Sequence, residues 1–438
     1  MEETINRFKK EIESIDKFLI IFISLIPLML AMSIFAADFL ASLSGLILII
    51  ILFKKKNLQI FSSIKKEIIY FLFFYTIIII SLLLSNYKEQ SFLASFFYFR
   101  YFLLSLSIFY LLKKYKFFKD FFYVFFLISI FIVVTDSIFQ YLFKYNSFGY
   151  QLIGTEDYGF RHLTGFFNTE KKLGSYLVRF LPLMIGLTYL YKKKIHFKYE
   201  FITLLILGVI VFLSSERTAL LLLFIVYFFY LIFSKYKIYI FVSLIILFTL
   251  LFSQNESFYT KYTIGTSNQI GLIYLFEESP RPIDKDFMRY YSYEHENLTY
   301  TGFVNFNNNP FFGSGVKTFF QECKSIEPKY QFKINKRNNR LTCSTHPHSL
   351  YVQILSETGI FAFLLIFFVF AKTLFKNLQI LFLKKNNYFN KFIFFINLSV
   401  IINLMPLIPS GSFYNNWMSL IMFFPLGFWL YINNKDLK

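Results

Sequence analysis

The sequence lacks the motifs by which many enzymes hold nucleotides or metal ions. It contains no Walker motif, no GxGxxG pattern and no convincing Asp-x-Asp pair. Such motifs place phosphates on glycine-rich loops or divalent cations on carboxylates. Nucleotide-sugar and metal-dependent chemistry are therefore not indicated, and we expect neither a metal site nor a cofactor.

Cysteine and internal repeats are also scarce. The only two cysteines, Cys323 and Cys343, lie in one polar segment. If that segment is outside the cytoplasm, a disulfide closing a loop of about 20 residues is plausible and would add about 3 kcal/mol of stability. We therefore predict this pairing. No clear repeat is visible, so an inverted-repeat transporter has no direct support.

Long apolar runs dominate the 438 residues, of which 56% are hydrophobic, and the mean hydropathy is +0.53. A helix needs about 20 residues to cross a bilayer, and continuous rather than alternating runs exclude a β-barrel. We predict an all-α polytopic membrane protein with about twelve transmembrane helices. The expected spans are 18–36, 38–53, 67–85, 92–112, 121–143, 173–191, 199–214, 217–234, 238–254, 349–371, 392–409 and 417–433.

The net charge of +19 comes largely from lysines in short loops between these runs. With twelve spans, the basic loops and both termini fall on one side, which the positive-inside rule identifies as cytoplasmic. Nucleic acid is therefore not an expected partner. We predict a multi-pass protein of a bacterial inner membrane with both termini in the cytoplasm.

The predicted topology divides the chain into three parts. Residues 1–254 carry helices 1–9 and a smaller periplasmic loop at 144–172. Residues 255–348 form one large periplasmic loop between helices 9 and 10, and residues 349–438 carry helices 10–12. The large loop is basic and aromatic, and it ends in histidines at a helix start, so we expect the chemistry on the periplasmic face.

Arginine side chains near the outer ends of the spans are candidate anion ligands, because guanidinium binds phosphate oxygens as a bidentate fork. A single arginine at such a position is also often an interfacial or solvated charge. The sequence alone leaves these two readings open for each residue. The candidates are Arg217, Arg289, Arg161 and Arg100.

His346 and His348 frame the string THPHS directly before a predicted helix. Pro347 keeps the backbone extended there. A helix N-terminus disfavours the cationic form of histidine, so a neutral imidazole remains available as a base near neutral pH. A structural loop histidine and a weak zinc site are the alternatives. Glu357, nine residues beyond His348, is interpreted as structural.

Four strings resemble the O-antigen ligase and O-antigen polymerase superfamily over roughly residues 155–370. They are NPFFGSGVKTFF, CSTHPHSLYVQILSETGIFAFLL, RHLTGFFNTEKKLGSYLVRFLPL and SSERTALLLL. The family's large periplasmic loop ends in a His-Asn or His-Ser pair, which His348 and Ser349 resemble, and a helix of the type YLQILAETGI follows. His346-Pro347 is an extra pair beyond that motif. The lysine-rich, cysteine-bracketed residues 318–341 have no counterpart in this resemblance.

The resemblance implies an inverting, metal-independent glycosyltransferase whose donor is a glycan on undecaprenyl diphosphate. By position, His348 would be the catalytic histidine that deprotonates the acceptor hydroxyl. Arg217 and Arg289 would hold the diphosphate, with Arg161 as a further candidate from the upstream string. His346 and Arg100 would support the site.

Three members of this class, one of which would transfer the glycan to protein serines or threonines, and one function of another class fit the sequence. A ligase would transfer the glycan to lipid A-core, and we take this as the first expectation. A polymerase would join it to a second lipid-linked glycan. A transporter or flippase of lipid-linked sugars would also need a cationic cavity, but alternating access does not require a histidine at the end of a large loop.

Overall fold

The computed structural model describes residues 13–55, 58–154, 162–191, 197–253, 262, 293–330, 343–382 and 387–434. Within these ranges the regular structure is helical, apart from isolated β-bridges. The elements are α2 (Ser14–Met32), α3 (Ile34–Lys55), η1 (Leu58–Ile64), α4 (Lys65–Leu84), α5 (Lys88–Phe96), α6 (Phe99–Lys114), α7 (Phe118–Phe143), η3 (Gly165–Phe167), α8 (Leu173–Tyr191), α9 (Phe197–Leu213), α10 (Arg217–Phe233), α11 (Lys237–Ser253), α14 (Tyr293–Asn308), α15 (Phe319–Tyr330), α16 (Leu350–Phe382), α17 (Tyr388–Asn403) and α18 (Asn416–Ile432).

Each of the twelve predicted apolar runs overlaps helical structure, the fourth being shared by α5 and α6. The runs 18–36 and 392–409 extend beyond the ends of α2 at Met32 and α17 at Asn403. In the part of the chain that the structure describes, seven helical segments are long and apolar enough to cross a membrane, and five further apolar helices are shorter. The prediction of an all-α membrane protein is confirmed. The number of twelve crossings stays a prediction.

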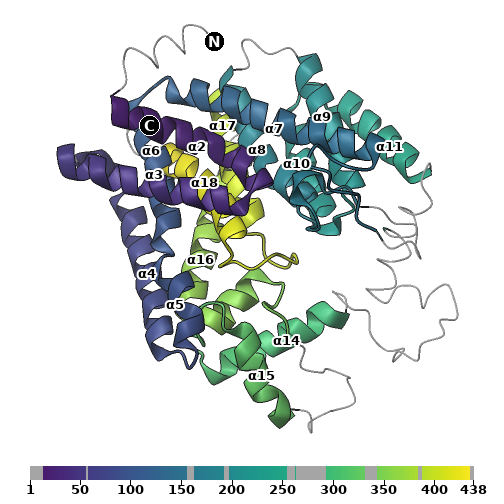
Figure 1. Ribbon diagram of the computed structural model, residues 1–438. Helices are drawn as coiled ribbons and strands as arrows, with labels where there is room; N and C mark the ends of the chain where they lie inside the picture. The colour runs from purple at the N-terminus through teal and green to yellow at the C-terminus, as the bar shows by residue number, and fades with distance from the viewer. Residues whose placement is uncertain are drawn as a thin grey trace, which may run out of the picture.

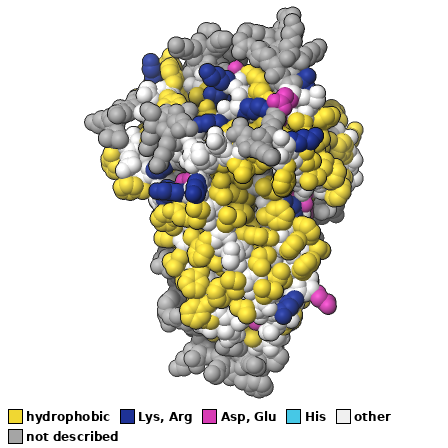
Figure 2. Space-filling model, turned by 90° about the vertical axis from the view of Figure 1, so that its left-hand side faces the viewer, with side chains coloured by type: hydrophobic (Ala, Val, Ile, Leu, Met, Phe, Trp, Pro, Cys, Tyr) yellow, Lys and Arg dark blue, Asp and Glu magenta, His cyan; other side chains and the backbone are white. Residues whose placement is uncertain are grey.

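The surface supports a membrane environment. On α4, Ile69, Phe73 and Leu83 are each at least half exposed. Figure 2 shows a broad field of hydrophobic side chains on the face that carries α4, with most of its Lys and Arg side chains gathered above it. A continuous apolar surface of this kind is unfavourable in water and is covered by lipid in a membrane protein.

The last two helices form the centre of the bundle. α17 is buried along most of its length and packs against α8 and α16, while α18 packs against α6. In Figure 1 the helices α14 and α15 lie beside α16 at the end of the molecule opposite the two termini. The described part of the large loop is therefore mainly helical and is docked onto α16.

Helix α16 is broken at Gly359, which has φ 77° and ψ −175°. Residues 350–358 form a short helix that is buried in protein, and a longer apolar helix continues to Phe382. The predicted span at 349–371 therefore differs from the structure. The segment before the break is nine residues long, and α16 packs against α14.

Candidate active site

The histidine segment lies between a disulfide and the start of α16. Cys343 precedes it, and α16 begins at Leu350, two residues after His348. The predicted position of the histidines at a helix start is confirmed. A hydrogen bond of 3.0 Å joins Thr345 Oγ1 to Nδ1 of His346.

His348 has an uncommon backbone conformation, with φ 51°. Non-glycine residues in this left-handed region store strain, and such strain is found disproportionately at functional sites. The loop before α18 holds the conformation: the Ser410 N–H donates to the carbonyl of His348 at 2.8 Å, and Ser349 forms a β-bridge with Pro409. Two segments far apart in sequence therefore fix the imidazole at one place.

Three imidazole rings gather at this position. The ring centroids of His346 and His348 are 4.1 Å apart. His295, on α14, approaches His348 edge-on at 5.4 Å. His295 was not among the predicted site residues, because only docking of α14 on α16 brings it to the pair.

A cavity of about 420 Å³ opens beside His348. His295, Thr299 and Ser349 contribute polar groups to its wall. The rest of the lining is apolar: Phe303, Pro347, Tyr351, Val352, Leu355, Phe363, Phe367, Pro406, Leu407, Ile408 and Pro409. The cavity thus places a candidate base at the edge of a hydrophobic chamber.

The second histidine is kept uncharged. Burial, together with the neighbouring His348 ring, lowers the pKa of His346 to about 4. Desolvation disfavours the cation, and a like charge nearby would add to that cost. At neutral pH His346 therefore presents a neutral ring to His348.

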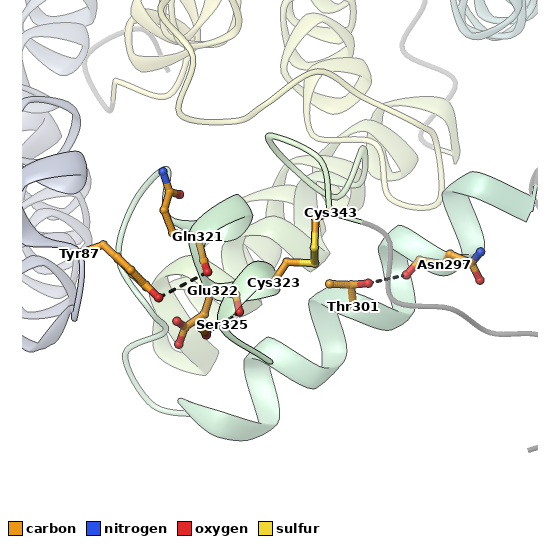
Figure 3. The surroundings of a disulfide bond; sticks show 8 residues. All are labelled: Tyr87, Asn297, Thr301, Gln321, Glu322, Cys323, Ser325 and Cys343. Carbon is orange, nitrogen blue, oxygen red and sulfur yellow. Dashed lines mark hydrogen bonds between the residues drawn. A yellow bond between two sulfur atoms is a disulfide. The ribbon is translucent and has the colours of Figure 1, made fainter. Parts of the chain in front are cut away.

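The predicted disulfide is present. Cys323 in α15 is fully buried and is bonded to Cys343, with a Cα–Cα distance of 5.5 Å. Figure 3 shows the bond between α15 and the segment that leads to the histidines, with Thr301 of α14 nearby. It ties the start of the histidine segment to a helix that packs on α14 and α16.

We expect replacement of both cysteines by serine to destabilise this part of the protein by about 3 kcal/mol, because the closed loop restricts the unfolded chain. Thiol labelling of the denatured protein checks the bond itself. Two thiols should react only after reduction. Equal labelling with and without reductant would contradict the disulfide.

Two glycine-containing strings of the sequence, NPFFGSGVKTFF and the SETGI of α16, form backbone hydrogen bonds with each other around the break in α16. The N–H groups of Ser314 and Gly315 donate to the carbonyls of Ser356 and Glu357, each at 3.0 Å. The Ile360 N–H donates to Pro310 at 2.9 Å. The residues of NPFFGSG thus satisfy backbone groups that the break would otherwise leave unpaired.

The side chain of Glu357 lies at this junction and is fully buried. One carboxylate oxygen accepts the Lys317 N–H and the Gln353 amide, each at 3.0 Å. Gln353 also donates to Ser412 at 2.9 Å and accepts the Phe413 N–H at 2.8 Å. The contacts support the structural interpretation of Glu357, since they link the junction to the loop that holds His348.

Arg217 is the first residue of α10 and is partly buried. The turn before it is tight, with φ 58° at Ser215. Glu216 accepts the Gly174 N–H at 2.6 Å, the Ser175 N–H at 3.0 Å and the Ser175 hydroxyl at 2.6 Å. A carboxylate at the N-terminus of α8 is favourable to its free N–H groups and dipole, so Glu216 fixes the Arg217 turn to α8.

This packing requires glycine at position 174. A Cβ there would lie 2.3 Å from Ser214 Oγ and 3.1 Å from a carboxylate oxygen of Glu216. Close approach of the turn to α8 is possible because glycine has no side chain. Gly174, the glycine of KLGSY, thereby allows the close contact that holds the Arg217 turn against α8.

Burial raises the pKa of Glu216 to about 7, although bonds from Ser175 and Gly174 oppose the shift. Between its ordinary pKa of 4.5 and about 7, the folded state binds more protons than the unfolded state, so stability falls as the pH rises through this window. We expect Glu216→Gln to remove this decline. Thermal-unfolding midpoints of both proteins between about pH 5 and about pH 8 measure this decline. Parallel curves for the wild type and Glu216→Gln would contradict the raised pKa of Glu216.

Arg179, in α8, was not among the predicted site residues. It is 4% exposed, and its Nη1 donates to Asn403 Oδ1 of α17 at 2.9 Å. An arginine within an apolar helix is itself a signal of function or of a buried polar contact. Here the contact joins α8, which carries the Glu216 turn, to the central helix.

The described residues of the segment 144–172 are hydrogen-bonded to the end of α7. Asp136 accepts the Ser147 N–H at 2.9 Å, and Gln140 accepts the N–H groups of Thr164 and Gly165 at 3.0 and 2.7 Å. That this segment covers part of the site stays a prediction. The candidates Arg161 and Arg289 lie outside the described residues.

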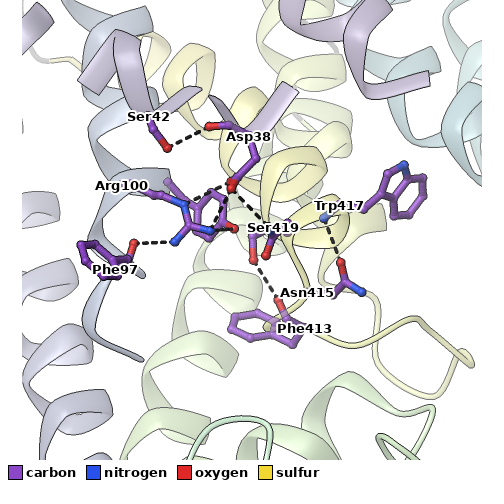
Figure 4. Close-up of polar contacts among 10 residues, drawn as sticks. Asp38, Ser42, Phe97, Arg100, Phe413, Asn415, Trp417 and Ser419 are labelled. Carbon is purple, nitrogen blue, oxygen red and sulfur yellow. Dashed lines mark hydrogen bonds and ion pairs between the residues drawn. The ribbon is translucent and has the colours of Figure 1, made fainter. Parts of the chain in front are cut away.

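Arg100 has an internal partner. Its Nε and Nη2 donate to the two carboxylate oxygens of Asp38 at 3.1 and 3.2 Å, and Nη1 donates to the Phe97 carbonyl at 2.9 Å. Figure 4 shows this pair between α3 and α6, beside the start of α18. The bidentate geometry fits a role in joining helices, and the proposed support of the site by Arg100 stays a prediction.

The structure thus brings His346 and His348 together and places Arg217 on a separate turn held by α8. Among the described residues, no group of three or more His, Cys, Asp or Glu side chains is arranged to hold a metal ion. Metal independence itself stays a prediction.

Comparison with known proteins gives one family. No curated protein matches the chain. Residues 202–367 match the family model described as O-antigen ligase. The matched region runs from α9 into α16 and contains Arg217, both cysteines and both histidines of THPHS. Over this region, which is less than half of its length, the chain is similar to the O-antigen ligase family.

Proposed function

We propose that this protein is an inverting glycosyltransferase of the bacterial inner membrane that moves a glycan from undecaprenyl diphosphate to an acceptor hydroxyl. Its acceptor is lipid A-core, which makes it an O-antigen ligase. The observation that carries the proposal is His348, held in a strained conformation at the edge of a hydrophobic cavity. The superfamily match supports the reaction class.

In the proposed reaction, an imidazole nitrogen of His348 accepts the proton of the acceptor hydroxyl. The hydroxyl oxygen forms a bond to the anomeric carbon from the face opposite the diphosphate. The bond between that carbon and the diphosphate oxygen breaks, and its electron pair leaves with the diphosphate. General-base catalysis of this kind contributes about 10²- to 10⁴-fold.

The leaving diphosphate requires positive charge that is already in place. Arg217 and Arg289 are proposed to bind its oxygens, with Arg161 as a further candidate. Positioned cations stabilise charge that develops in the transition state without reorganisation at the moment of reaction. The apolar wall of the cavity suits the hydrocarbon chain of the donor, which must remain near the membrane.

We expect Arg217→Ala to lower glycan transfer by about 10²- to 10³-fold, since it removes a donor to the leaving group. Arg217→Lys should recover only part of the loss, because lysine keeps the charge but not the planar fork. Transfer assays on equal amounts of membrane-inserted protein compare the two. Lys144→Ala, at the end of α7, is the matched control. A wild-type rate of glycan transfer by Arg217→Ala would contradict the proposed role of Arg217 in binding the diphosphate.

A lipopolysaccharide gel of a strain without this gene, complemented by wild type or His348→Ala, tests the acceptor. Loss of all capped core, with lipid-linked polymer accumulating, is the result expected for the ligase. Core with a single repeat unit would instead identify the polymerase. A normal ladder, with lipid-linked sugar trapped in the cytoplasmic leaflet, would favour a transporter.

A further inference from the structure

A second cavity lies away from the histidines, between α4 and α16, with α6, α17 and α18 as its floor. It shares no lining residue with the cavity beside His348. Most of its wall is hydrocarbon or aromatic: Tyr70, Phe71, Phe74, Phe102, Leu365, Ile366, Phe368, Val369, Val400, Leu404, Phe413, Met422, Phe423, Leu426 and Leu430. We refer to it as the α4–α16 crevice.

Charged and amphipathic side chains gather at one end of the crevice. Lys372 Nζ lies 3.6 Å from a carboxylate oxygen of Glu67. The same atom is 5.8 Å from the ring centre of Tyr70 and 5.9 Å from that of Trp429. Exposed lysines at positions 65 and 66 begin α4 next to Glu67. This end is therefore a basic mouth ringed by aromatic side chains.

Trp429 provides an independent sign of a ligand. Its side chain lines the crevice and is 3% exposed, yet its Nε1–H has no hydrogen-bond partner within the described part of the chain. A buried donor left unpaired is unfavourable, and nearly all such groups find an acceptor. An oxygen atom entering at the mouth would provide one beside the Lys372 ammonium.

We propose that the α4–α16 crevice binds a membrane phospholipid with an anionic headgroup. One acyl chain lies along the apolar wall, and headgroup or ester oxygens accept from Trp429 Nε1–H and Lys372. Basic pockets between membrane helices on the cytoplasmic side favour anionic lipids, and the positive-inside pattern assigns this lysine-rich end to that side. The inference is independent of the proposed transfer reaction.

The chain contains only two tryptophans, which gives a direct readout. Trp417→Phe leaves Trp429 as the single fluorophore. This variant is placed in phosphatidylcholine vesicles that contain increasing fractions of phosphatidylglycerol or phosphatidylcholine with brominated acyl chains. Because Trp429 is shielded from bulk lipid, its quenching reports lipid in the crevice. We expect phosphatidylglycerol to quench at about fivefold lower fraction, because phosphatidylcholine offers the same phosphate acceptor but its choline cancels the net negative charge that Lys372 attracts.

Variants of the mouth decide whether Lys372 causes the preference. Lys372→Gln should abolish it, and Lys372→Arg, which keeps the charge, should retain it. Lys119→Gln is the matched control, because Lys119 lies 5.7 Å from the Tyr431 ring on α18 but outside the crevice. Val369→Phe should reduce quenching by either lipid by filling the wall. Equal quenching by the two lipids, or a preference that survives Lys372→Gln, would overturn the proposal.

Discussion

His348→Ala is expected to lower glycan transfer by about 10²- to 10⁴-fold, the contribution of a positioned general base. The variant should still insert and fold, because the bond from the Ser410 N–H to the carbonyl of residue 348 does not involve the side chain. Alanine keeps that carbonyl. The loss should therefore appear in turnover more than in donor binding.

A transfer assay with purified donor and acceptor measures this effect, with thermal unfolding as the folding check. His196→Ala is the matched control, since His196 belongs to a basic loop that the sequence assigns to the cytoplasmic side. Both proteins should unfold at wild-type temperature, and only His348→Ala should lose transfer. Normal transfer by folded His348→Ala would remove His348 from the mechanism.

Gly359→Ala is expected to have the largest structural effect. Its φ of 77° disfavours any side chain, and a Cβ would lie 2.1 Å from the Phe311 carbonyl oxygen and 2.3 Å from its carbon. These are backbone atoms, so relief requires the NPFFGSG segment to separate from α16. We expect a loss above about 3 kcal/mol, or failure to accumulate folded protein.

Gly149→Ala separates backbone strain from the clash. Gly149 has φ 83°, but a Cβ there meets nothing within 4 Å. It should cost about 1 kcal/mol, which is the scale of strain alone. Unfolding midpoints in detergent compare the two variants. Equal shifts would show that the interlocked junction contributes little to stability.

The sequence predicted the helices well because twenty-residue apolar runs are a strong, local signal. It did not predict the break within 349–371. The apolar side chains among residues 350–358 are buried in protein, and composition does not separate protein-facing from lipid-facing residues. The backbone partners of the break come from residues 310–315, which lie more than forty positions earlier.

The candidate site was predictable where the chemistry is carried by adjacent residues. His346 and His348 are two positions apart, and two cysteines allow only one pairing. Contacts between distant segments were not predictable. Arg100 pairs with Asp38 across 62 positions, and Glu216 reaches Gly174 across 42. His295 joins the histidine pair only through the docking of α14.

Transfer by the purified protein in vesicles tests the central claim most directly. The vesicles contain a glycan on undecaprenyl diphosphate and a lipid A-core acceptor, without other proteins. The account predicts glycan-capped core with inverted anomeric configuration, one free lipid diphosphate for each transfer, and no product with His348→Ala. Movement of the donor across the vesicle membrane without capped core would contradict the account.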